Sequence, residues 1–435
     1  MSHNIKSRLA ADPQENENKK IKKHGKHESG ESVKLTRLQK LLVWALAILI
    51  VLEGGYALAV YSQIPFIANL RTIYIQTAMS TMRHQWLATA FIPRDIIDNV
   101  MEGVRSAEES QIGLSSTWTV TANNRVIYNR PTMTAEERAF YELFWELDPL
   151  SMSDYLDRHP DALSNGWDAV YINEAGLDDN GTDIKTISGD QVLAIDAKNR
   201  IILIRVAGSG YRGVLAIAKD PSKLSIKMAS TLPNYGQTAG KIASNNNGVL
   251  SMTANGFIDE DAQGHQGYGN GGVLAGFAMS DGKKYGSHMG WGNKRIELHK
   301  DDRFYIVDVD APVSSDCTDA AEFTPAMIID SKVLVDENCG WNAINPRACI
   351  GQTDIGEIMM LTIEGRQLQS LGTGVVECAA IMARYHCAQA MNLDGGTSAI
   401  MWYQGEYVMR CSNLNCPEGR TLPSAFVYTG TRLDQ

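Results

Sequence analysis

The stretch MNLDGGTSAIMWYQGEYV, residues 391–408, has one carboxylate at the point where a strand-like segment bends. Asp394 follows an apolar approach and precedes Gly395 and Gly396. Two hydroxyl side chains come next, those of Thr397 and Ser398. An Asp-Gly pair alone is typical of a turn in which the carboxylate bonds to its own backbone. Glycines also let backbone N–H groups approach a ligand closely, so the stretch equally fits a reactive carboxylate beside anion-binding groups.

Two arginines lie on either side of this stretch in the chain. Arg347 is in the strand-like run INPRACIGQT (344–353), and Arg420 is in GRTLPSAFVYTG (419–430), which leads into a last strand. A guanidinium presents a planar fork of N–H donors that fits phosphate oxygens. We therefore expect Arg347 and Arg420 to bind a phosphate group; the alternative for Arg347 is a surface salt bridge.

A second carboxylate, Glu377, lies near the start of GVVECAAIMARYHC (374–387), whose apolar residues repeat at helical spacing. The helix dipole favours a carboxylate in the first turn. Glu377 is therefore either a second catalytic carboxylate or a helix-start residue that orients the site.

Four segments, in this order, resemble the phosphodiester glycosidase family: PRACIG, EGRQLQSLGTGVVECA, AMNLDGGTSAIMW and CPEGRTLPSAFV. Two upstream segments, YRGVLAIAKDPSKLSI and TANGFID, are similar to further parts of the family pattern, so the resemblance covers roughly residues 187–430. Thr253 stands where the family usually has Asn, and Thr397 stands where it usually has a third glycine. The resemblance implies hydrolysis of a sugar–phosphate diester, with Asn255 among the substrate-binding residues.

That reaction, at the anomeric carbon, passes through an oxocarbenium-like state and releases a phosphomonoester that gathers negative charge. It needs a carboxylate beside the sugar and cations or N–H groups beside the phosphate. We expect Asp394 to act as nucleophile or base. The expected phosphate and substrate contacts are Arg347, Arg420, Asn255, Gly395, Gly396, Thr397 and Ser398.

Two other functions would use the same residues. One is a phosphodiesterase that cleaves the P–O bond, and the other is a glycan-binding or exopolysaccharide-biosynthesis scaffold without catalysis. In each case the expected partner is a phosphoglycan or a smaller sugar phosphodiester.

Patterns for cofactors are weak. DEDAQG (259–264) begins like a calcium loop, but position 12 is Asn270 instead of Glu, so it is not an EF-hand, and a looser calcium site stays open. GSGYRG (208–213) and GYGNGG (267–272) lack the strand–helix context of a dinucleotide fingerprint. We expect no certain cofactor, with calcium as the candidate ion.

The N-terminal region predicts membrane attachment. Residues 41–61 form an apolar run with one charge, Glu53, and at 1.5 Å per residue it spans about 31 Å, close to the hydrocarbon thickness of a bilayer. Residues 1–40 hold ten Lys or Arg against five acids and predict a disordered cytoplasmic tail. The expected topology is a single-pass cell-membrane protein with its catalytic part outside and no nucleic-acid partner. A cleaved signal peptide and a buried helix are the alternatives.

Beyond the span, residues 62–185 predict an α-rich membrane-proximal module, and 186–435 predict the glycosidase domain. Short apolar runs between Gly, Asn and Asp turns indicate an α+β or α/β unit there, and with the family resemblance we expect α+β with a mixed sheet.

All seven cysteines lie in this part, where disulfides are permitted. Cys411–Cys416 is the first expected pair and Cys317–Cys339 the second, while Cys378 and Cys387 also fit core packing.

Overall fold

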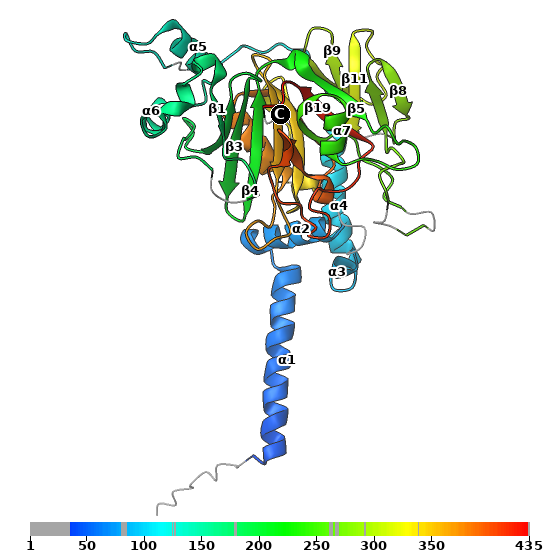
Figure 1. Cartoon of the computed structure of the whole chain (residues 1–435). Helices are drawn as coiled ribbons and strands as arrows, with labels where there is room; N and C mark the ends of the chain where they lie inside the picture. Colours follow the sequence, from blue (N-terminus) through cyan, green and yellow to red (C-terminus); the bar gives the residue numbers. More distant parts are fainter. Residues whose placement is uncertain are drawn as a thin grey trace, which may run out of the picture. The chain divides into compact units, whose positions relative to one another are not determined.

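The computed structural model (Figure 1) describes residues 35–79, 85–123, 125, 128–177, 181–260, 264–265, 269–290, 293–337 and 339–433. The chain divides into two compact units, Met1–Leu58 and Ala59–Gln435. Most of the predicted cytoplasmic tail, residues 1–34, lies outside the described residues.

The first unit contains α1 (Arg37–Tyr61), whose last three residues belong to the second unit. The helix begins with a reciprocal capping box, because the Thr36 N–H bonds to Gln39 Oε1 at 2.9 Å and the Gln39 N–H bonds to Thr36 Oγ1 at 3.3 Å. α1 is long and apolar enough to cross a membrane. The predicted helix over 41–61 is confirmed and begins four residues earlier, while its role as anchor or signal stays a prediction.

The second unit is organised around an antiparallel sheet, nine-stranded within the described residues. Its spatial order is β1 (Tyr171–Asn173), β2 (Gln191–Asp196), β3 (Ile201–Gly208), β4 (Tyr211–Ala218), β15 (Ile358–Ile363), β14 (Arg347–Thr353), β16 (Cys387–Asn392), β12 (Ala326–Ile329) and β13 (Lys332–Val333). Both faces are buried: along β3, Leu203 packs into one core cluster and its neighbours Ile202 and Ile204 into another.

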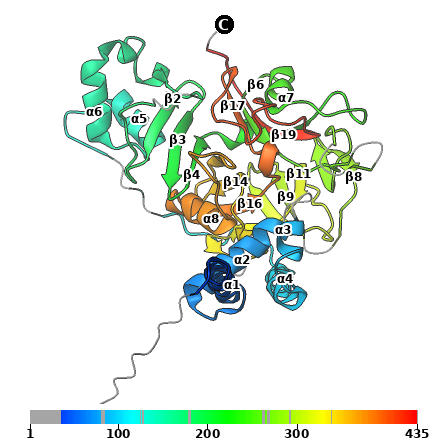
Figure 2. The same cartoon turned by 90° about the horizontal axis from the view of Figure 1, so that it is seen from below.

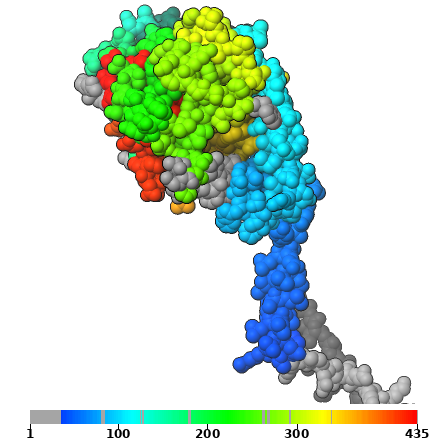
Figure 3. Space-filling view, turned by 90° about the vertical axis from the view of Figure 1, so that its right-hand side faces the viewer, coloured from blue at the N-terminus to red at the C-terminus, as the bar shows by residue number. Residues whose placement is uncertain are grey.

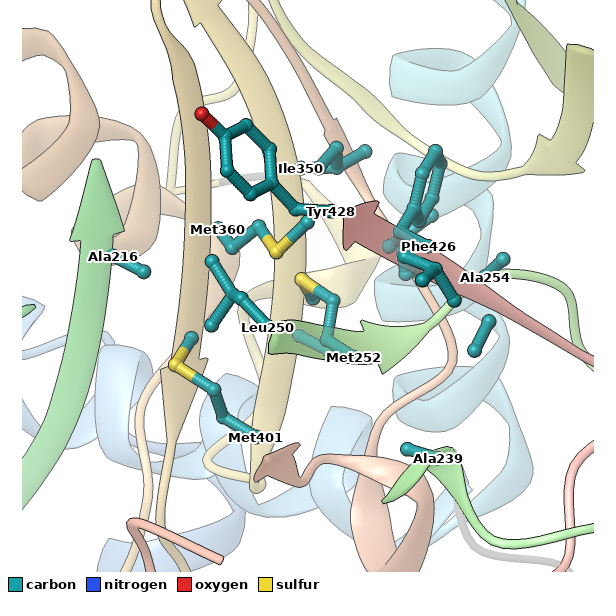
Figure 4. Close-up of a cluster of buried hydrophobic side chains, with 14 of the residues drawn as sticks. Ala216, Ala239, Leu250, Met252, Ala254, Ile350, Met360, Met401, Phe426 and Tyr428 are labelled. Atoms are coloured by element: carbon teal, nitrogen blue, oxygen red, sulfur yellow. The ribbon is translucent and has the colours of Figure 1, made fainter. Parts of the chain in front are cut away.

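Two smaller sheets complete the strands that the structure describes. One has the order β10 (Phe304–Asp308), β9 (Lys294–His299), β11 (Cys317–Phe323), β7 (Phe277–Ser280) and β8 (Lys283–Gly286). The other has the order β18 (Glu406–Tyr407), β17 (Met401–Tyr403), β6 (Gly248–Thr253), β19 (Ser424–Thr429) and β5 (Leu224–Met228), with α7 (Ala239–Asn245) packed on it. Figure 4 shows the core between this sheet and the large one, where Met252 and Phe426 face Ile350 and Met360.

The α+β class is confirmed, but the expectation of a mixed sheet is wrong, since the strand pairs described are antiparallel. The reason lies in the helical crossover α8 (Val375–Arg384), which joins β15 to β16. These two strands run in the same direction but do not pair, because β14 lies between them and is antiparallel to both.

Helices α2 (Pro65–Met79), α3 (Trp86–Thr89) and α4 (Arg94–Glu109) share a small core made by Ile75, Ala78, Ala88, Ile92 and Ile97. Figure 2 shows them side by side, and Figure 3 shows residues of this colour range covering one side of the second unit. α5 (Ala135–Leu143) and α6 (Pro149–Arg158) pack instead on the large sheet. The helices predicted for 62–185 therefore exist, but they join one compact unit with the strands that follow.

A buried ionic cluster ties the α5–α6 region to the large sheet. Lys219, at the end of β4, bonds to Glu146 and, at 3.0 Å, to Glu357. All three side chains are buried, and burial raises the pKa of Glu146 to about 7 despite the attraction of Lys219. Trp145 adds a ring N–H bond to Glu357 at 3.2 Å. The lysine therefore stabilises two carboxylates that water does not reach.

We predict that Lys219→Met lowers the free energy of unfolding by about 3–5 kcal/mol at pH 8, because two buried carboxylates lose their cation. The loss should be smaller at pH 5. A carboxylate whose folded pKa lies above its unfolded value costs stability as pH rises through that interval, and Glu146 is such a group. Urea unfolding at both pH values measures this.

Lys227→Met is the matched control, because Lys227 pairs with the exposed Asp281 and its loss should cost about 1 kcal/mol or less. Equal losses for Lys219→Met at pH 5 and pH 8 would contradict the assignment.

All seven cysteines, each within the described residues, carry free thiols. The expected Cys317–Cys339 disulfide is wrong, since the two residues pack in separate core clusters. The expected Cys411–Cys416 disulfide is also absent from the structure, where the two thiols are hydrogen-bonded neighbours. Cys378 and Cys387 pack in the core, as the alternative interpretation expects.

Candidate active site

Asp394 is positioned by the end of β16. The last residue of that strand, Asn392, pairs with Cys349 on β14, and the Leu393 N–H bonds to the Ala348 carbonyl at 2.8 Å. The chain then turns into the short 3₁₀ helix η5 (Gly396–Ser398). The carboxylate therefore projects from a turn that the centre of the large sheet fixes.

Both glycines of this turn are required by geometry. A Cβ on Gly395 would lie 2.6 Å from the Pro346 carbonyl oxygen, and Gly396 has φ +59°, which L side chains rarely adopt. The Gly396 N–H also bonds to Pro346 O at 3.1 Å. The turn is thus pressed against the strand that begins at Arg347.

The Asp394 carboxylate is half-buried and accepts hydrogen bonds from the Ser398 hydroxyl and the Gly395 N–H. Burial raises its pKa to about 6, an effect that these bonds and the positive charge of Arg420 oppose and that Asp259 adds to. A carboxylate with this pKa is mainly ionised at pH 7 and retains basicity suited to a general base or nucleophile.

Arg420 is close enough to act on Asp394, but its guanidinium already has partners. It binds Asp259 with both terminal nitrogens, at 2.7 Å and 2.5 Å, and donates to the Gly269 carbonyl at 2.6 Å. It also lies 4.5 Å from the centre of the Phe257 ring. Asp259 thus compensates the positive charge of Arg420, the residue that we expected to bind phosphate.

Arg366 is the residue that the sequence argument did not single out. It follows the Glu364-Gly365 turn after β15, has φ +60°, and is exposed. Its two terminal nitrogens lie 3.5 Å from an ideal Cβ at Gly396, and Nη2 donates to Asn345 Oδ1 at 3.2 Å. Although the residue as a whole is exposed, its guanidinium is partly buried, which lowers the pKa of Arg366, and the attraction of Asp394 opposes that effect. Arg366 is thus a cation near Asp394, and the hydrogen bond that its side chain donates goes to a neutral amide, that of Asn345.

A sequence signal for Arg366 existed. It is the arginine of EGRQLQSLGTG, one of the segments that carry the family resemblance, and it follows a strand next to the one that carries Arg347. Because antiparallel neighbours put the end of one strand beside the start of the next, Arg366 comes to the same edge of the sheet as Asp394.

Arg347 itself points into the protein. Its Nε donates to Thr373 O at 3.1 Å, and Nη2 donates to Trp341 O and Ala343 O, both at 2.6 Å. The side chain is buried, which lowers the pKa of the guanidinium. The structure thus gives Arg347 a different set of partners from the phosphate expected, and it holds residues 341–345, which carry the Asn345 that bonds to Arg366.

Glu377 and Asn255 have hydrogen-bond partners other than Asp394. Glu377 is exposed on α8 and accepts the Tyr211 hydroxyl at 2.6 Å. Asn255 is fully buried: its amide nitrogen donates to Phe277 O at 3.0 Å and its amide oxygen accepts the Ser424 hydroxyl at 3.0 Å. These contacts fit the helix-start interpretation of Glu377 and a structural role for Asn255.

The anion-binding backbone groups are fewer than expected. The Gly395 N–H donates to the Asp394 carboxylate, and the Gly396 N–H donates to the Pro346 carbonyl oxygen. The Thr397 N–H has no hydrogen-bond partner within the part of the chain that the structure describes. Its side chain is held by the Ser412 hydroxyl at 3.5 Å. Thr397 is therefore the backbone donor open to a ligand.

The described residues contain no group of three or more His, Cys, Asp or Glu that could hold a metal ion. Asp259, the first residue of the calcium-like segment, bonds to Arg420, and residues 261–263 of that segment lie outside the described residues. Calcium binding stays a prediction.

We predict that Asp259→Asn lowers the pKa of Asp394 below its value of about 6. The substitution removes a negative charge that raises this pKa and releases Arg420 from its ion pair. A ¹³C carboxyl titration of aspartate-labelled protein measures the shift. Glu260→Gln, one residue further along, is the control and should leave the titration unchanged; a rise for Asp259→Asn would contradict the geometry.

Comparison with known proteins gives the following similarities. Residues 243–429 match the phosphodiester glycosidase family model. Over 110 residues the chain is 29% identical to the SPbeta prophage-derived uncharacterized protein YomE of Bacillus subtilis, a match that covers 25% of this chain and only 17% of that protein.

Among solved structures, the catalytic domain of zebrafish N-acetylglucosamine-1-phosphodiester alpha-N-acetylglucosaminidase, auto-inhibited by its pro-peptide, is 17% identical with a TM-score of 0.44, covering 53% of this chain and 82% of that one. A putative exported protein from Burkholderia pseudomallei is 14% identical with a TM-score of 0.39, covering 50% and 74%.

Proposed function

We propose that the chain hydrolyses the bond between the anomeric carbon and the phosphate oxygen of a sugar-1-phosphodiester, a proposal supported by the match of residues 243–429 to the phosphodiester glycosidase family model. The observation that carries this proposal is the position of Arg366, whose two terminal nitrogens lie 3.5 Å from an ideal Cβ at Gly396, two residues after Asp394, and whose charge interacts with Asp394. The reaction develops positive charge on the sugar and negative charge on the leaving phosphate. The carboxylate of Asp394 can stabilise the first charge and the nearby guanidinium of Arg366 the second.

In this mechanism Asp394 acts on the anomeric carbon, as nucleophile or as the base for water. Its bonds from Ser398 and Gly395 hold the carboxylate in one orientation. A phosphomonoester is a good leaving group, so a strong general acid is less necessary. With a pKa of about 6, Asp394 is ionised in most molecules at neutral pH.

Arg366 and the Thr397 N–H bind the phosphate in this scheme. Both are donors without a charged acceptor among the described residues, and the charge that develops on the leaving phosphate would supply one. The Arg420–Asp259 pair adjusts the pKa of Asp394, which burial raises, from outside the reacting atoms. Arg347 supports Arg366 through residues 341–345.

We further propose that α1 stays attached as an uncleaved anchor, with residues 1–34 in the cytoplasm and the domain outside, facing a cell-surface or extracellular phosphoglycan. The length and apolar composition of α1 and the basic residues before it support this topology. An intact N-terminus and resistance to alkaline carbonate extraction would test it.

The central test is hydrolysis of a panel of soluble sugar-1-phosphate methyl diesters in ¹⁸O-labelled water, analysed by mass spectrometry before the free sugar exchanges its anomeric oxygen. We expect the label in the sugar and none in methyl phosphate. Asp394→Asn should lower kcat by about 10³-fold or more, whereas Asp281→Asn, on the surface, should leave it unchanged.

Label in the phosphate would instead indicate P–O cleavage by a phosphodiesterase. Glycan binding without turnover would indicate a scaffold. Full activity in Asp394→Asn would contradict the catalytic assignment.

For Arg366→Ala we predict a fall in kcat/KM of about 10²–10³-fold, since one charge-assisted contact to the leaving phosphate is lost. Arg366→Lys should recover part of the activity, because the charge remains but the fork does not. Arg384→Ala is the matched control: this exposed arginine on α8 pairs with Asp190 and its loss should leave kcat/KM near the wild-type value. Equal activity of Arg366→Ala and wild type would exclude the proposed phosphate contact.

A further inference from the structure

One side of α2 carries an uncharged apolar face that is open in the structure. Phe66, Leu70 and Tyr74 are 73%, 52% and 44% exposed, and their spacing of four residues puts them along one side of the helix. The opposite side packs Ile75 and Ala78 into the small core shared with α3 and α4. Both sides of α2 therefore carry apolar side chains, one packed in the small core and one open.

The open face continues onto α3 and the residues after it. The Tyr74 hydroxyl donates to the Leu87 carbonyl at 2.8 Å, which joins α3 to the open side of α2. Trp86 and Phe91 are 55% and 58% exposed, and their ring centres lie 6.5 Å apart. We call these five residues, Phe66, Leu70, Tyr74, Trp86 and Phe91, the aromatic surface.

The aromatic surface is directly connected to the apolar helix. Three residues separate the end of α1 from the start of α2, a stretch that reaches at most about 11 Å. Arg71, the one charged residue of α2, donates from Nη1 to the carbonyls of Val60 at 2.9 Å and Ser62 at 3.0 Å. These bonds hold α2 to Val60 and Ser62 within the second unit and give the charge of Arg71 two backbone acceptors.

We propose that the aromatic surface lies in the interfacial region of the lipid bilayer and forms a second membrane contact beside α1. This inference rests on the proposed anchoring, which ends α1 at the lipid–water boundary and starts α2 there. Aromatic side chains with a polar edge prefer that boundary, and an apolar helix face can bury itself there without crossing the bilayer.

The contact would also orient the candidate active site. α2 and α4 pack against η4 (Gly340–Asn342), and Glu108 on α4 accepts the Trp341 ring N–H at 3.1 Å. Three residues after η4, Asn345 bonds to Arg366. One short segment therefore links the aromatic surface to the site, so a lipid contact would hold that site at a fixed height, as suits substrates displayed close to the membrane.

The test uses the full chain reconstituted in phosphatidylcholine vesicles whose acyl chains are brominated, because bromine quenches nearby tryptophans. Trp44 lies in α1 and is removed by Trp44→Phe so that it does not contribute. In that background we expect brominated lipid to quench Trp86, and the further change Trp86→Phe to remove most of the quenching. Trp118→Phe is the matched control, since Trp118 is partly buried and bonded to Phe304 O, and it should retain the quenching.

A second pair of variants tests the surface itself. Phe66→Ser with Leu70→Ser should reduce the quenching of Trp86, whereas Leu150→Ser on α6, 72% exposed, should not. The quenching of Trp44 is measured as the difference between the wild-type chain and Trp44→Phe. Unquenched Trp86 together with quenched Trp44 would overturn this inference and leave the anchor intact. Quenched Trp86 with unquenched Trp44 would overturn the anchor but support the lipid contact. Disulfide cross-linking between two copies that carry Phe66→Cys or Leu70→Cys, with Trp86 unquenched, would show that a second copy covers the surface. That result would overturn the proposal.

Discussion

The candidate site depends on the antiparallel pairing of β16 with β14 at the centre of the large sheet. This pairing brings the end of β16 against the start of β14, so that Gly395 and Gly396 lie directly on the Pro346 carbonyl. A side chain on Gly395 would collide with that carbonyl, and Gly396 has a φ of +59° that L side chains rarely adopt. A strand at the sheet centre, buried on both faces, has little freedom to shift, and the carboxylate that follows it is therefore held in one place.

Three arginines lie near this turn, and their hydrogen-bond partners separate their roles. Arg347 is buried and bonds to three backbone carbonyls, and Arg420 is compensated by Asp259. Arg366 is exposed and bonds to one amide oxygen. An arginine whose donors are already satisfied gains little from a phosphate, while one that faces solvent beside a carboxylate can still bind one. The proposed function follows this distinction.

The segments before the large sheet are held to it by different interactions. α5 and α6 join through a buried apolar cluster and the Lys219 ion cluster, whereas α2, α3 and α4 form their own small core and reach the sheet through η4. Burial of a charge network makes the first attachment specific, since each of its members is costly to leave unpaired. The second attachment leaves the outer side of α2 and α3 apolar and available, which is the basis of the proposed lipid contact.

Local features were predictable from the order of residues alone. An apolar run with a single charge, long enough to span a bilayer, predicted α1. Helical apolar spacing predicted α8, and the Asp-Gly-Gly order predicted a tight turn at Asp394, because each of these features depends on neighbours in the chain. Sequence order also carried the resemblance to the phosphodiester glycosidase family, through motifs that match it except at positions such as Thr253 and Thr397. Tertiary structure decided which polar groups meet: that Arg347 turns inward, that Asn255 is buried, that Asp259 compensates Arg420 and that Arg366 lies beside Asp394. Those outcomes depend on strand order and on the burial of each guanidinium, and contacts between residues far apart in the chain leave no periodic trace in the sequence.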